Sequence, residues 1–105
     1  MATLCILSLL NEGEMYGYEI AQALDNISGG RFVLPEGTLY PILYRLEDNG
    51  YLNTRRVLVG KRMTRVYYRL SERGQQYYAT LLEDYKSIQI GVQLILEDGG
   101  VDRGR

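Results

Sequence analysis

The side chains best suited to catalysis and metal binding are scarce in this sequence. The chain contains no histidine, and Cys5 is its only cysteine. A cysteine–histidine dyad, a histidine-based triad, a Cys/His zinc site and an intrachain disulfide are therefore all impossible within one chain. The adjacent acids Glu47 and Asp48 fall on a predicted helix, where neighbours point in different directions and form a poor acid/base pair. We expect no enzyme activity, no cofactor and no metal site. Cys5, in apolar surroundings, is expected to be a small buried residue, with a redox-sensing thiol as the alternative.

Electric charge is the chemistry that the sequence does concentrate. The formal net charge is only −1, but residues 1–30 carry four acids and no base, and residues 71–105 carry six acids and four bases. Residues 31–70 carry eight bases and three acids, a net charge of +5. A basic segment between acidic flanks places positive potential on one surface, and this local field matters more than the total. The pattern favours a nucleic-acid partner.

Three helices must help to position these basic side chains. Hydrophobic periodicity predicts helices at residues 2–10, 16–27 and 38–49, with a short extended rung at 31–34. Thr38 is expected to be the N-cap of the third helix. Pro41 then falls in the first turn, where its missing N–H has no intrahelical partner to lose. The third helix turns an apolar stripe toward the core, formed by Leu39, Ile42, Leu43 and Leu46.

A β-hairpin is predicted after the third helix, with strands at residues 52–59 and 62–70. The two residues between the strands, Gly60 and Lys61, fit a tight type II′ turn. Because side chains alternate along a strand, one face of the second strand packs while the other is basic and aromatic. Tyr68 is expected in the core, as is Tyr18 of the second helix. The packing face carries Val66, Tyr68 and Leu70, and the opposite face carries Met63, Arg65, Tyr67 and Arg69.

A final helix is predicted from the N-cap Ser71 to about Asp98. Its apolar residues step by three and four, which is the spacing of a helix that packs against a partner helix. The tail at residues 99–105 has little to bury and is expected to be disordered. The predicted dimer interface consists of Tyr78, Leu81, Tyr85, Ile88, Val92 and Ile95.

This order of elements predicts a mainly α (α+β) fold, a winged helix-turn-helix with a two-stranded wing and a C-terminal dimerisation helix. Residues 1–70 form the predicted DNA-binding domain and residues 71–98 the dimerisation helix. In such a fold the third helix enters the major groove, while the hairpin, or wing, reaches the adjacent backbone or minor groove. The predicted DNA contacts are Gly37, Thr38, Tyr40, Pro41, Tyr44, Arg45, Lys61, Arg62 and Arg65.

Each predicted contact has a chemical role and a simpler alternative. Arg45 suits a guanine edge or a phosphate, tyrosine hydroxyls suit phosphates, and the start of the third helix offers open N–H groups. Alternatively, a basic hairpin can be a solvated edge, the tyrosines can pack, and Arg45 can pair with Glu47 or Asp48. The runner-up function is a winged-helix protein–protein adaptor, which the sequence pI of 5.4 favours.

Four motifs together resemble the PadR family of bacterial transcriptional regulators. They are GYEI at residues 17–20, GTLYPIL at 37–43, RLE at 45–47 and RVYYRLSERG at 65–74. The resemblance extends from Leu4 to about Leu96. It implies a winged helix-turn-helix of the small subfamily, in which a single C-terminal helix forms the homodimer. It also implies that Tyr40 touches the DNA backbone and that Lys61 and Arg62 occupy the wing tip.

The resemblance further implies a repressor that releases double-stranded DNA when a small aromatic or cytotoxic compound binds. Multidrug-sensing members stack flat ligands between tryptophans, and this chain has no tryptophan. Tyr85, Ile88 and Val92 could line a smaller cavity, but interface packing is the preferred interpretation. A two-fold dimer predicts a pseudo-palindromic operator. Without an apolar stretch of ~20 residues or a signal peptide, we expect no membrane contact and a cytoplasmic location.

Overall fold

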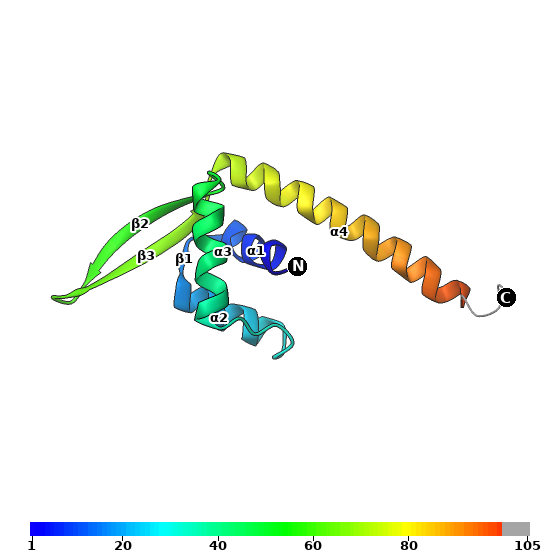
Figure 1. The fold of residues 1–105 in the computed structure, drawn as a ribbon, viewed down its shortest axis with the longest axis horizontal. Coiled ribbons are helices and arrows are strands. Elements are labelled where there is room, and N and C mark those ends of the chain that lie inside the picture. The colour runs from blue at the N-terminus through cyan, green and yellow to red at the C-terminus, as the bar shows by residue number, and fades with distance from the viewer. Residues whose placement is uncertain (100–105) are drawn as a thin grey trace.

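The computed structural model describes residues 1–99 of the chain, and the remainder of the predicted disordered tail lies outside the described residues. Helices α1, α2 and α3 form a central body (Figure 1). The hairpin extends from one side of this body, and α4 projects from the other. The longest extent of the molecule is 67 Å. The elements in chain order are α1 (Ala2–Glu12), β1 (Met15–Tyr16), α2 (Gly17–Ile27), α3 (Glu36–Asp48), β2 (Leu52–Val59), β3 (Met63–Leu70) and α4 (Glu72–Asp98).

The core lies where the three short helices meet the inner face of the sheet. The predicted stripe of α3 is confirmed, since Leu39, Leu43 and Leu46 are buried and Ile42 packs against them. Burying each such side chain stabilises the fold by roughly 1.5–3 kcal/mol, so the stripe fixes which face of α3 remains open to solvent. The fully buried side chains are Ile6, Leu7, Ile20, Leu39 and Leu43.

The sheet has a third strand that the sequence analysis did not predict. Its order is β1-β3-β2, and Met15 and Tyr16 of β1 pair with Tyr68 and Tyr67 of β3. The extended rung predicted at residues 31–34 is wrong, since that segment joins no strand. The N–H of Phe32 instead donates to Ser28 Oγ at 2.8 Å, which holds the segment against the end of α2.

The hairpin turn also differs from the prediction. Val59 pairs with Met63, so three residues rather than two connect the strands, and Gly60 adopts a φ of +68°. The register decides this length. Leu52 and Leu70 pair and are both buried, whereas a two-residue turn would slip the partners by one position and turn a polar side chain into the core.

The start of α3 lies earlier than predicted, and Thr38 is not its N-cap. The carbonyl of Pro35 accepts hydrogen bonds from the N–H groups of Thr38 and Leu39, both at 2.9 Å, so the helix begins at Glu36. Pro41 is therefore inside the helix. It lacks the N–H that would bond the carbonyl of Gly37, but Gly37 is exposed and water can reach that group. The helix gains an exposed N-terminal turn.

The two tyrosines predicted to lie in the core have different outcomes. Tyr68 is 2% exposed, which confirms its place in the core. Tyr18 is 56% exposed, so its predicted burial is wrong. A capping interaction, in which the N–H of Tyr16 donates to Glu19 Oε1 at 3.1 Å, starts α2 at the surface and directs Tyr18 outward, stacked on the Tyr16 ring. Cys5 is half-buried and packs against the core. In the described part of the chain, no helix is both long and apolar enough to cross a membrane.

Candidate nucleic-acid interface

The open face of α3 carries most of the side chains predicted to contact DNA. Thr38, Pro41, Tyr44 and Arg45 are all exposed, together with the backbone of Gly37. Arg45 forms no ion pair with any described residue, so the predicted alternative of pairing with Glu47 or Asp48 does not occur. This face therefore presents a cation and polar groups to solvent along one helix.

Tyr40 differs from these residues because it is half-buried and closely packed. Its hydroxyl lies against Gly17 at the start of α2, where an added Cβ would be only 2.3 Å from Tyr40 Oη. Burial, with smaller contributions from Glu36 and Tyr44, raises the pKa of Tyr40 above its usual value. The hydroxyl therefore stays protonated and able to donate. The ring centroids of Tyr40 and Tyr44 are 5.9 Å apart, so this anchor also supports Tyr44.

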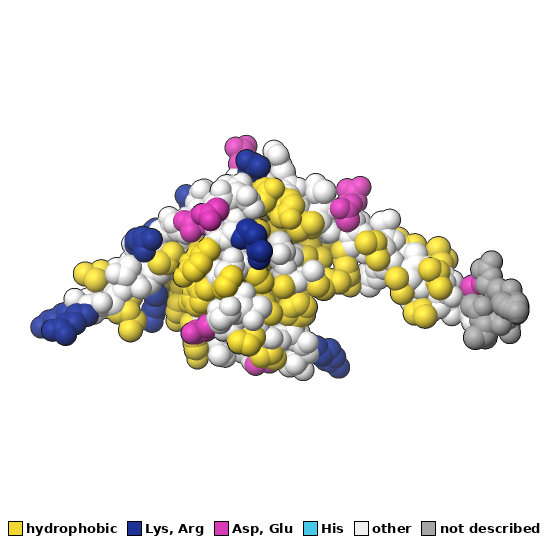
Figure 2. All heavy atoms as spheres, in the orientation of Figure 1, with side chains coloured by type: hydrophobic (Ala, Val, Ile, Leu, Met, Phe, Trp, Pro, Cys, Tyr) yellow, Lys and Arg dark blue, Asp and Glu magenta, His cyan; other side chains and the backbone are white. Residues whose placement is uncertain are grey.

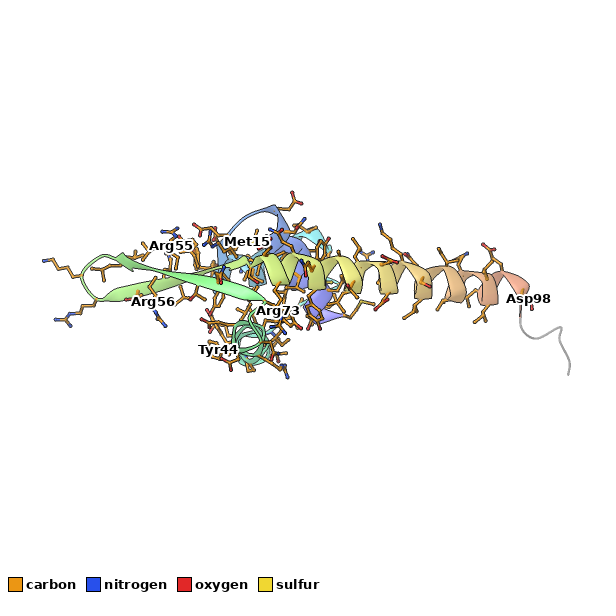
Figure 3. All side chains as sticks on the ribbon, turned by 90° about the horizontal axis from the view of Figure 1, so that it is seen from above. Met15, Tyr44, Arg55, Arg56, Arg73 and Asp98 are labelled. Carbon is orange, nitrogen blue, oxygen red and sulfur yellow. The ribbon has the colours of Figure 1, made fainter. Side chains whose placement is uncertain are left out.

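The body of the hairpin meets α3 in an open corner. Thr54 Oγ1 of β2 donates to Glu47 Oε2 of α3 at 3.2 Å and joins the two elements. Burial raises the pKa of Tyr68 to about 12, with further increases from Tyr44 and Glu47 and an opposing effect from Arg56. These groups are therefore near enough to affect the Tyr68 hydroxyl, and Figure 3 shows Tyr44 and Arg56 on the same side of the sheet. We call this region, formed by Tyr40, Tyr44, Glu47, Thr54, Arg56 and Tyr68, the α3–β2 corner.

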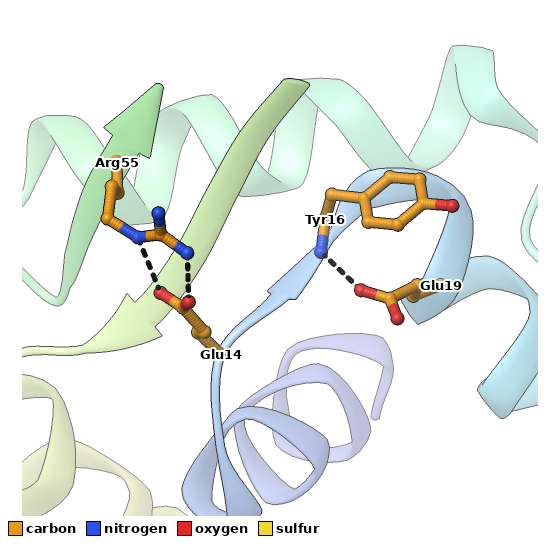
Figure 4. A network of polar contacts seen from close by, with 4 residues as sticks. All are labelled: Glu14, Tyr16, Glu19 and Arg55. Atoms are coloured by element: carbon orange, nitrogen blue, oxygen red, sulfur yellow. Dashed lines mark hydrogen bonds and ion pairs between the residues drawn. The ribbon is translucent and has the colours of Figure 1, made fainter. Parts of the chain in front are cut away.

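The opposite face of the sheet holds a separate aromatic and charged cluster. The guanidinium of Arg65 lies 4.3 Å from the centroid of the Tyr16 ring, so Arg65 does not join the other predicted contacts at the α3–β2 corner. Arg55 Nε donates to Glu14 Oε2 at 3.3 Å, and its Nη2 donates to the other carboxylate oxygen (Figure 4). These hydrogen bonds lower the pKa of Glu14. These contacts of Arg55 and Arg65 connect strands β2 and β3 to the segment that precedes α2.

The wing tip is the third part of the site. Lys61 and Arg62 lie in the exposed turn between β2 and β3. Figure 2 shows basic side chains at the far end of the hairpin, well away from the body. The sequence analysis missed Arg56, which pairs with Val66 on the sheet face assigned to packing. The same alternation could have identified it, because this face extends beyond the core toward the wing tip.

The base of α4 is joined firmly to the end of α3. The N–H of Ser71 donates to the carbonyl of Tyr51 at 3.0 Å, and the rings of Tyr51 and Tyr77 stack with centroids 4.1 Å apart. Ser71 Oγ accepts from the N–H of Gly74 at 2.9 Å, which confirms the predicted N-cap. An added Cβ at Gly74 would be 2.0 Å from the carbonyl oxygen of Tyr51. The direction of α4 is therefore fixed relative to the open face of α3.

Comparison with known proteins identifies the family. The family model of the transcriptional regulator PadR-like family matches residues 6–80. The chain belongs to this family. The resemblance predicted from the four motifs is confirmed, as is the winged helix-turn-helix class. Within the PadR-like match lie most of α1, all of α2, α3 and the sheet, and the first part of α4.

Relatives of the PadR-like chain include regulators of known structure. The negative transcriptional regulator PadR of Bacillus subtilis is 31% identical over 71 residues, which is 68% of this chain and 39% of that protein. A transcriptional regulator from Clostridium thermocellum superimposes with a TM-score of 0.80 at 35% identity, covering 87% of this chain and 88% of that one. B. subtilis PadR in complex with operator DNA gives a TM-score of 0.72 at 28% identity, covering 77% and 46%.

The PadR-like chain also has an apolar groove and an exposed apolar helix end. The groove has a volume of about 480 Å³ and is lined by α1, the end of α2, Phe32 and α4. Tyr78 and Leu81 of the predicted dimer interface pack on their own core, and Tyr85 lines the groove. Farther along α4, Ile88, Val92 and Ile95 are 66%, 48% and 68% exposed. Figure 2 shows apolar side chains along the projecting helix.

Proposed function

We propose that this PadR-like protein is a sequence-specific DNA-binding transcriptional regulator that represses transcription as a homodimer. The observation that carries the proposal is the open face of α3, where the exposed Arg45 forms no ion pair with any described residue, beside the α3–β2 corner and the basic wing. A helix of this kind fits the major groove, and a short basic wing fits the adjacent backbone or minor groove. The related B. subtilis PadR, whose structure is in complex with operator DNA, supports the same assignment. DNA as the ligand implies a cytoplasmic site of action.

The proposed contacts follow from where each side chain lies. Arg45 and Tyr44 on the open face of α3 contact base edges or phosphates. In the first turns of the same helix, Gly37, Thr38 and Pro41 approach the DNA backbone. The Tyr40 hydroxyl donates a hydrogen bond to a phosphate beside the start of α2. Lys61 and Arg62 at the wing tip enter the minor groove. Arg65 is the least directly placed proposed contact, because its guanidinium rests on the Tyr16 ring.

We propose a homodimer formed through α4. The apolar strip on α4 is exposed on a helix that projects from the body, and the same strip on the partner's α4 would cover it. A two-fold dimer separates its two recognition helices by about one turn of DNA, ~34–36 Å, so the operator is pseudo-palindromic. The proposed interface comprises the α4 residues Tyr78, Leu81, Tyr85, Ile88, Val92 and Ile95.

A small aromatic or cytotoxic compound is the proposed effector. The groove supports this proposal because it is apolar and carries the rings of Phe32, Tyr78 and Tyr85. Because α4 is joined to the end of α3 through Tyr51, a compound that moves α4 would change the spacing of the recognition helices. The expected result is release of DNA.

The first experiment is a titration of the purified protein against the DNA upstream of its own gene at two salt concentrations. We expect saturable binding with two subunits per site, competition only by the same sequence, and a steep decrease in affinity with salt. Weak binding that is equal on unrelated DNA would lead to a search for another operator by selection from random sequence. Failure of that selection as well would contradict the proposal and favour a protein–protein adaptor.

A further inference from the structure

Arg55 and Arg56 are neighbours on β2 whose side chains leave opposite faces of the sheet. Arg55 pairs with Tyr67 and Arg56 with Val66, and Figure 3 shows the two arginines on opposite sides of the strands. The charge of Arg55 is compensated by its ion pair with Glu14. Arg56 forms no ion pair with any residue that the structure describes, and its side chain is exposed. Of the two charges, only that of Arg56 is available to an external anion.

Arg56 lies at the mouth of the α3–β2 corner. Thr54, two residues earlier on the same face of β2, donates to Glu47 of α3 and fixes the distance between strand and helix. Arg56 also affects the Tyr68 hydroxyl, whose pKa it lowers against the larger effect of burial. Tyr44, on the open face of α3, is on the same side of the sheet (Figure 3). The guanidinium of Arg56, which pairs with no described acid, therefore lies on the same side of the sheet as the face of α3 proposed to contact DNA.

The position of Arg56 along the strand indicates which part of DNA it meets. Gly60 lies four positions after Arg56, which is ~13 Å of extended chain at ~3.3 Å per residue. A helix in the major groove and a wing tip in the adjacent minor groove straddle one sugar–phosphate backbone. Arg56 lies on the strand that crosses between these two elements, so its side chain faces that backbone rather than a base edge.

We propose that Arg56 binds a phosphate of the backbone between the two grooves and supplies affinity without sequence preference. This inference rests on the proposed DNA-binding function and adds a contact outside α3 and the wing tip. Arginine suits the task because its planar guanidinium can donate two parallel hydrogen bonds to one phosphate. Each phosphate neutralised on duplex DNA contributes ~0.9 to the slope of log affinity against log salt.

The test compares Arg56→Gln with Arg55→Gln. Both variants lose one positive charge from the same strand, but on opposite faces. The affinities of each variant and of the unaltered protein are measured over a series of salt concentrations. The probes are a duplex selected from random sequence by the unaltered protein and a mixed-sequence duplex. We expect Arg56→Gln to reduce the slope by ~0.9 per subunit and to weaken both DNAs by the same factor. Arg55→Gln should keep the wild-type slope, and Arg56→Lys should restore it.

Three results would overturn the inference while leaving the proposed function intact. They are a wild-type slope in Arg56→Gln, a loss confined to the selected duplex, which would indicate a base contact, and an equal reduction in Arg55→Gln, which would indicate a general charge effect. If selection from random sequence yields no duplex that the unaltered protein binds, the proposed function fails and this inference fails with it. Comparing the unaltered protein with the variants in one assay separates the two failures.

Discussion

The junction between α3 and α4 predicts an unusually costly glycine substitution. Gly74→Ala would place a Cβ 2.0 Å from the carbonyl oxygen of Tyr51, where ordinary contacts begin at 3.4 Å. The obstacle is backbone, so no side-chain rotation can relieve it. The carbonyl of Tyr51 accepts from the N–H of Ser71, and the N–H of Tyr51 donates to Leu46 at the end of α3. Any relaxation at Gly74 therefore disturbs both helices.

The magnitude follows from the groups that must move. Accommodating an extra carbon in a packed site costs roughly 1–3 kcal/mol. Loss of the hydrogen bond between Ser71 and Tyr51 adds about 1 kcal/mol. The better helix propensity of alanine offsets about 1 kcal/mol. We therefore expect a net decrease of about 1–3 kcal/mol in the free energy of unfolding. For a domain of this size, each kcal/mol lowers Tm by roughly 4–8 °C.

Urea and thermal unfolding followed by circular dichroism would measure the effect, with protein concentration held constant because dimerisation shifts apparent stability. The matched control is Gly91→Ala in the same helix, where an added Cβ has nothing within 4 Å in this chain. The control should be stabilised by up to about 1 kcal/mol. If Gly74→Ala is as stable as the wild type, or gains stability like the control, the close contact with Tyr51 does not exist.

Three further predictions follow from individual contacts. Gly17→Ala should displace the Tyr40 phenol, whose hydroxyl oxygen lies 2.3 Å from the new Cβ. Titrations should then show weaker DNA binding, with little change in Tm because the Tyr40 side chain can move. Unchanged affinity would contradict this role of Tyr40. The pKa of Glu14 is lowered from 4.5, so its ion pair stabilises the fold above that pH and the contribution disappears as pH falls through the lowered value. Urea unfolding of Glu14→Gln should therefore show a smaller loss of stability below pH 4.5 than the wild type, and superimposable pH profiles would refute this. Ile95→Glu should yield monomers in analytical ultracentrifugation, whereas Gln93→Glu, on another side of α4, should remain dimeric; a dimeric Ile95→Glu would exclude this strip from the interface.

The alternation of side chains along a strand predicts which face of the sheet each residue takes, but the sequence analysis used it only for β3. It correctly placed Tyr68 and Leu70 inward, and both are buried. The same alternation on β2 puts Arg56 on the inner face, but a face that is inner near the core is open near the wing tip. Strand periodicity gives the side of a sheet and not how far the core extends beneath it. For that reason the sequence suggested Arg65 as a contact and left out Arg56.

Local signals in the sequence determined the helices, the two hairpin strands and the family. The apolar stripe of α3 and the N-cap Ser71 depend on residues within a few positions of each other, so periodicity and capping identify them directly. Only the tertiary structure decided the pairing of β1 with β3 and the three-residue hairpin turn. Both result from contacts between distant segments, since burial of Leu52 opposite Leu70 sets the register that the turn must then accommodate. The α3–β2 corner has the same origin, because its members come from three elements that meet only when the core has formed.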